Sequence, residues 1–71
     1  MLIAEMLQRA GLAFMSAKGR HSRGGVRIDD VLCEIAEHAQ AVDEWAKREG
    51  FPVVARVATA EELAEWKRWQ E

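Results

Sequence analysis

Apolar residues recur at helical spacing at the start of the chain. The repeating positions are Leu2, Ile3, Met6, Leu7 and Ala10. Intervals of three and four residues place these side chains on one face of a helix. Gly11 follows directly, where glycine commonly ends a helix. The pattern therefore predicts a first helix over residues 2–10.

A longer apolar stripe occupies the middle of the chain. Its members are Ile28, Val31, Leu32, Ile35, Ala39, Val42, Trp45 and Ala46. Asp29 or Asp30 suits the N-cap of a helix, and Gly50 suits its end. We therefore expect one long amphipathic helix over residues 30–49, with Cys33 on the polar face opposite the stripe.

The segment between these two predicted helices contains an evident loop. Residues 18–25 hold three glycines and no apolar side chain, which is typical of a loop. Residues 26–28 fit a short strand because valine and isoleucine are β-branched. The apolar residues 12–17 fit either a strand or a helix. Together these segments predict a β-hairpin with a basic tip.

The C-terminal third combines a strand signal with a helix start. Residues 53–57 are rich in valine and predict a strand. Thr59 and Glu62 have the spacing of a capping box, in which each side chain accepts a hydrogen bond from the other residue's backbone. The helix that follows carries Leu63, Trp66 and Trp69 on one side.

These elements predict an α+β fold in the order α-β-β-α-β-α, as one domain over residues 1–71. The alternative is a mostly helical dimer, in which residues 12–17 stay helical and the long helix forms the seam between two copies. A chain of 71 residues buries a small core, so either version gains stability from a second copy or a partner.

Charge divides the chain into two unlike parts. The first 27 residues carry five basic residues against one acidic residue, and the remainder carries eleven acidic against five basic. Such polarity orients a protein toward a partner. The single cysteine excludes an internal disulfide, and no apolar run is long enough to cross a membrane. We therefore expect a cytoplasmic protein.

The sequence offers no convincing catalytic or metal-binding constellation. Cys33 and His38 would lie about 140° apart around the predicted helix, so a thiol–imidazole pair is not expected. Glu34 and His38 are four residues apart, which predicts a hydrogen bond between them rather than a metal site. We expect a protein that is not an enzyme and that uses no cofactor or metal.

Candidate partner-binding residues fall into two groups. The basic loop, residues 18–27, carries Lys18, Arg20, His21, Arg23 and Arg27, and the last helix carries Trp66 and Trp69. We expect a protein-interaction module that binds and modulates a larger protein or nucleoprotein assembly, as accessory or inhibitor proteins of phages and mobile elements do, alone or as a homodimer. The alternative is a nucleic-acid-binding regulator that uses the basic loop.

Overall fold

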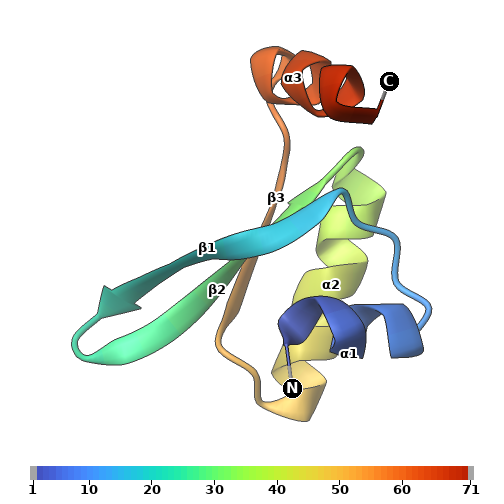
Figure 1. Cartoon of the computed structure of the whole chain (residues 1–71). Coiled ribbons are helices and arrows are strands. Elements are labelled where there is room, and N and C mark those ends of the chain that lie inside the picture. The colour runs from blue at the N-terminus through green and yellow to red at the C-terminus, as the bar shows by residue number, and fades with distance from the viewer. Residues whose placement is uncertain (1, 71) are drawn as a thin grey trace.

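The computed structural model describes residues 2–70, and for residues 18–23, 26 and 27 it describes the backbone alone. Its elements, shown in Figure 1, are α1 (Ile3–Arg9), β1 (Ser16–Arg23), β2 (Val26–Cys33), α2 (Ala36–Glu49), β3 (Val53–Val57) and α3 (Ala60–Gln70). The α+β class and the order α-β-β-α-β-α predicted from the sequence are therefore confirmed.

The three strands form one mixed sheet with β2 in the centre. β1 pairs with β2 antiparallel, and β3 pairs with β2 parallel on the other side. The parallel pair is joined by α2, as a crossover between parallel strands requires. Figure 1 shows α3 at one end of the sheet and the turn of the β1–β2 hairpin at the other.

The core lies between one face of the sheet and the helices α1 and α2. Its fully buried side chains come from both of these helices and from the central strand: Leu7 from α1, Val31 and Cys33 from β2, and Val42 from α2. Trp45 is buried as predicted, and its ring centroid lies 5.2 Å from that of Phe51. The opposite face of the sheet is without a covering helix over most of its length (Figure 1).

The long helix begins later than the sequence predicts. The expected helix over residues 30–49 is α2, which starts at Ala36, and the residues expected to cap it, Asp29 and Asp30, lie in β2. The error arises because the apolar stripe fits both periods. Val31 and Cys33, two residues apart, both face the core, and pairing with β1 and β3 favours the strand.

The expected loop over residues 18–25 is mostly strand. The mostly helical alternative is wrong as a fold, because Ser16 and Ala17 lie in a strand rather than in a helix. β1 runs from Ser16 to Arg23. The turn shrinks to Gly24 and Gly25, whose φ angles of 55° and 81° match a two-residue hairpin turn. Glycine adopts positive φ at both central positions without steric cost, so long strands can meet in a very short turn.

This turn gives a testable stability prediction. The Gly25→Ala variant is expected to lower the free energy of unfolding by about 1–2 kcal/mol, because a Cβ opposes positive φ. The Gly24→Asn variant is the control, since Asn-Gly is a favoured pair in this turn type. Urea titration followed by circular dichroism measures both variants. Equal stability of Gly25→Ala and the wild type would contradict the turn geometry.

The outer edge of β3 is partly covered by α2. The N–H of Ala58 donates to Cys33 on β2 at 2.9 Å, and alternate residues of a strand point their N–H groups the same way. The N–H of Ala55 therefore points away from β2, where it donates to Oδ1 of Asp43 at 3.3 Å. A capped edge of this kind is a poor template for pairing with another strand.

Candidate docking site

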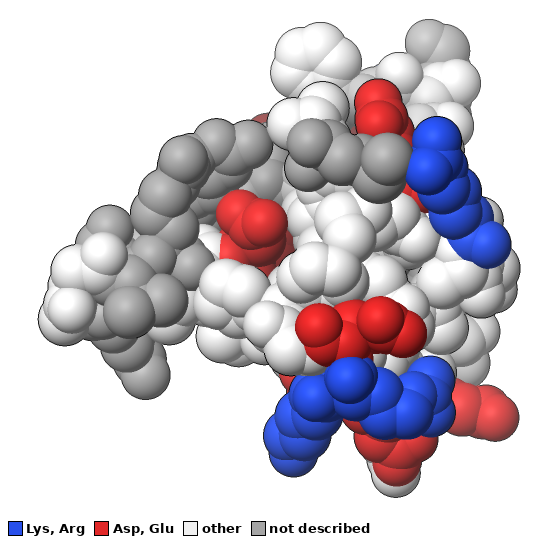
Figure 2. Space-filling view, turned by 90° about the horizontal axis from the view of Figure 1, so that it is seen from below, with Lys and Arg blue, Asp and Glu red and all other residues white. Residues whose placement is uncertain are grey.

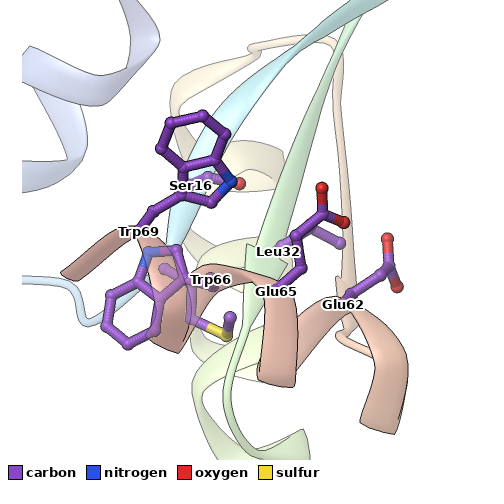
Figure 3. Close-up of a pocket in the computed structure, with 7 residues that line it drawn as sticks. Ser16, Leu32, Glu62, Glu65, Trp66 and Trp69 are labelled. Carbon is purple, nitrogen blue, oxygen red and sulfur yellow. The ribbon is translucent and has the colours of Figure 1, made fainter. Parts of the chain in front are cut away.

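A hollow lies where α3 crosses the end of the sheet. Its cavity volume is about 190 Å³, and its lining residues are Met15, Ser16, Leu32, Glu62, Glu65, Trp66 and Trp69. Figure 3 shows the two indoles on one side of this hollow and the two carboxylates on the other. We call it the tryptophan groove.

The start of α3 is fixed by the capping box that the sequence predicts. The N–H of Glu62 donates to Oγ1 of Thr59 at 3.2 Å, and the N–H of Thr59 donates to Oε1 of Glu62 at 3.0 Å. These bonds satisfy backbone groups that a helix start leaves free. The capping box therefore sets where α3 begins after β3.

An ion pair that the sequence analysis missed fastens α3 to the sheet. Both guanidinium nitrogens of Arg56 bond Glu62, with Nη1 to Oε1 at 2.7 Å and Nη2 to Oε2 at 2.8 Å. Arg56 pairs with Leu32 across the parallel ladder, so both project from the face of the sheet that α2 does not cover. The pair holds α3 at this face, next to Leu32.

The same contacts hold the pKa of Glu62 far below its usual value. The Arg56 hydrogen bonds and those from Thr59 lower this pKa from 4.5 to about 2. Because the folded value is lower than the unfolded one, the group stabilises the folded state above pH 4.5. That stabilisation is lost as pH falls from about 4.5 toward 2.

We therefore expect Glu62 to contribute to acid sensitivity. The urea midpoint of the wild type should fall more steeply between pH 5 and pH 2.5 than that of the Glu62→Gln variant. The Glu61→Gln variant is the matched control, because Glu61 lies in the same helical turn and does not line the groove. Parallel pH curves for wild type and Glu62→Gln would contradict the role of Glu62.

The two tryptophans of α3 differ in exposure. Trp66 is half-buried against the groove, whereas Trp69 is 81% exposed. No side chain of α3 is fully buried. The sequence singled out both tryptophans as partner-binding residues, and the structure brings them together with Met15 and Leu32, which the sequence did not single out. Leu32 was missed because the end of β2 was predicted to be helical, and Met15 was missed because residues 12–17 fitted either a strand or a helix.

Most of the basic candidates lie elsewhere in the fold. Lys18, Arg20, His21, Arg23 and Arg27 fall on the two strands of the hairpin, and their side chains lie outside the described residues. The hairpin turn and α3 are at opposite ends of the sheet (Figure 1). The candidates nearest the turn therefore lie apart from the groove, whereas Lys18 lies two residues along β1 from Ser16, which lines the groove.

The residues considered for catalysis or metal binding do not lie where the sequence predicts them. Cys33 lies buried in β2, not on an exposed helix face, and its thiol donates to the Ala13 carbonyl at 3.8 Å. Burial, with a smaller effect of Asp43, raises the pKa of this thiol. Glu34 precedes α2, so the expected helical pairing with His38 is wrong. Within the described part of the chain, no cluster of three or more His, Cys, Asp or Glu residues could hold a metal ion.

Charged side chains of both signs are mixed on another described face. Seen from below (Figure 2), acidic and basic side chains lie side by side in places, and uncharged surface surrounds these groups.

In the part of the chain that the structure describes, no helix is long and apolar enough to span a membrane. The protein matches no known family, no curated protein and no solved structure.

Proposed function

We propose that this protein is a small interaction module that docks onto a partner protein through the tryptophan groove. The observation that carries the proposal is the exposure of Trp69, 81% of which lies in solvent at the mouth of the groove. A large aromatic side chain in water is a favourable anchor for an interface, because docking removes its apolar surface from solvent.

The dimensions of the groove favour a side chain as its occupant. Small-molecule sites usually enclose about 300–1,000 Å³. The groove offers about 190 Å³ and is open to solvent along one side. An apolar cavity of about 150 Å³ accommodates benzene. One large aliphatic or aromatic side chain of a partner therefore fits the groove, whereas an enclosed substrate does not.

The groove is built to keep its shape before a partner arrives. The capping box fixes the first turn of α3, and the Arg56–Glu62 pair joins that turn to β3. A preformed site binds more tightly because less conformational freedom is lost on association. This supports docking as the role of α3, which contributes no fully buried side chain to the core.

A selection from a random dodecapeptide library tests the proposal. Peptides enriched on the wild type are expected to contain a large apolar anchor and to lose binding when Trp69 is replaced by alanine. The Leu2→Ala variant is the control, since Leu2 is an exposed apolar residue outside the groove. Peptides that bind Trp69→Ala as tightly as wild type would overturn the proposal.

A second candidate function is nucleic-acid binding through the hairpin. It is favoured by the position of five basic or histidine residues on a two-stranded ribbon that extends beyond the helices (Figure 1). Ribbons of this kind enter DNA grooves in some regulators. Replacing Arg20, Arg23 and Arg27 by alanine should then abolish a mobility shift with duplex DNA that weakens steeply with salt. A shift that survives the triple replacement would exclude this function for the hairpin.

A further inference from the structure

The charges at the rim of the tryptophan groove are not equivalent. The Glu62 carboxylate is already paired, because its two oxygens accept hydrogen bonds from Arg56 and from the N–H of Thr59. Glu65 lies about one helical turn later, lines the same groove and is exposed. Among the described residues, its carboxylate has no hydrogen bond or ion pair. The rim therefore presents one carboxylate that has no charged partner among the described side chains.

The aromatic wall of the groove favours a positively charged ligand, as the Glu65 carboxylate does. The faces of an indole ring carry negative potential and attract cations such as the lysine ammonium and the arginine guanidinium. Trp69 offers an exposed indole beside the groove, and Glu65 lies across from it (Figure 3). Two independent features of the rim, a carboxylate without a described partner and an exposed ring, thus select for positive charge.

We infer that the occupant of the groove is a partner segment in which a large apolar side chain stands next to lysine or arginine. The inference rests on the proposed docking function. The apolar side chain contacts Met15, Leu32 and Trp66, and the neighbouring cation lies between Glu65 and the indole of Trp69. The same groove disfavours an apolar anchor flanked by aspartate or glutamate, because Glu65 repels the added carboxylate.

Two small probes with the same aromatic ring and stem test this inference on the intact protein. 2-Phenylethylammonium and 3-phenylpropionate share a phenyl ring and a two-carbon stem and differ in the sign of their charge. Binding is followed by NMR through the indole N–H signals of Trp66 and Trp69. We expect the cation to bind about fivefold more tightly, the size expected for one exposed ion pair with a cation–π contribution.

Two variants separate the role of Glu65 from the overall charge of α3. Glu65→Gln should reduce the preference for the cation to the part that the indole of Trp69 contributes, while leaving binding of the phenyl ring. Glu61→Gln makes the same change on the same helix outside the groove and should keep the preference. Equal binding of both probes to the wild type would overturn the inference and leave the docking function standing. Failure of both probes to shift either indole signal would overturn the docking function as well.

Discussion

Replacing Leu7 with alanine is expected to remove a large share of the protein's free energy of unfolding at room temperature. Leu7 is fully buried and is the residue by which α1 enters the core cluster. Such a replacement costs about 2–5 kcal/mol, because apolar contacts are lost and a cavity remains. A domain of 71 residues has a total stability of about 4–11 kcal/mol, so the loss is a large share of it.

Leu2→Ala provides the matched control for this prediction. It makes the same chemical change at the start of the same helix, but at a side chain that is 56% exposed. We expect it to alter the free energy of unfolding by less than about 0.5 kcal/mol. Urea titrations of both variants decide the question. Similar losses for Leu7→Ala and Leu2→Ala would show that α1 does not seal the core.

Replacing both Trp66 and Trp69 with alanine is expected to weaken binding of a library-selected peptide at least about thirtyfold. Truncating an aromatic anchor at the centre of an interface costs about 2 kcal/mol or more. Trp69→Ala alone should lower the affinity without changing the urea midpoint, since its side chain is mostly in water. Isothermal titration calorimetry and urea titration separate these two effects.

The Trp69→Ala variant distinguishes a loss of binding from a loss of structure, which the double variant alone cannot do. Trp66 is half-buried, so its removal also loosens α3 from the sheet. Trp69→Phe keeps an aromatic anchor and should recover part of the affinity lost in Trp69→Ala. Undiminished peptide binding by the double variant would show that the groove is not the docking surface.

Signals that lie within a few residues of one another predicted their elements well. The capping box of Thr59 and Glu62 forms as expected, and β3 spans the predicted residues 53–57. Gly50 ends α2 with a φ angle of 76°, in the left-handed region that glycine adopts readily. In each case the atoms that decide the structure are neighbours in the chain.

Elements that depend on distant partners were predicted less well. Residues 30–33 fit a helix by periodicity but form a strand, because β1 and β3 pair with them on both sides. The groove was missed for the same reason. Leu32 reaches it only through the strand that replaces the predicted helix, and Arg56 meets Glu62 only through the parallel register. Periodicity along the chain contains neither relation.

The measurement that tests the account most directly is a set of intermolecular NOEs between a selected peptide and the protein. We predict NOEs from the peptide's apolar anchor to the indoles of Trp66 and Trp69 and to the side chain of Leu32. NOEs confined to the hairpin strands, with none to the residues of the tryptophan groove, would contradict the claim that this protein docks through α3 and the end of its sheet.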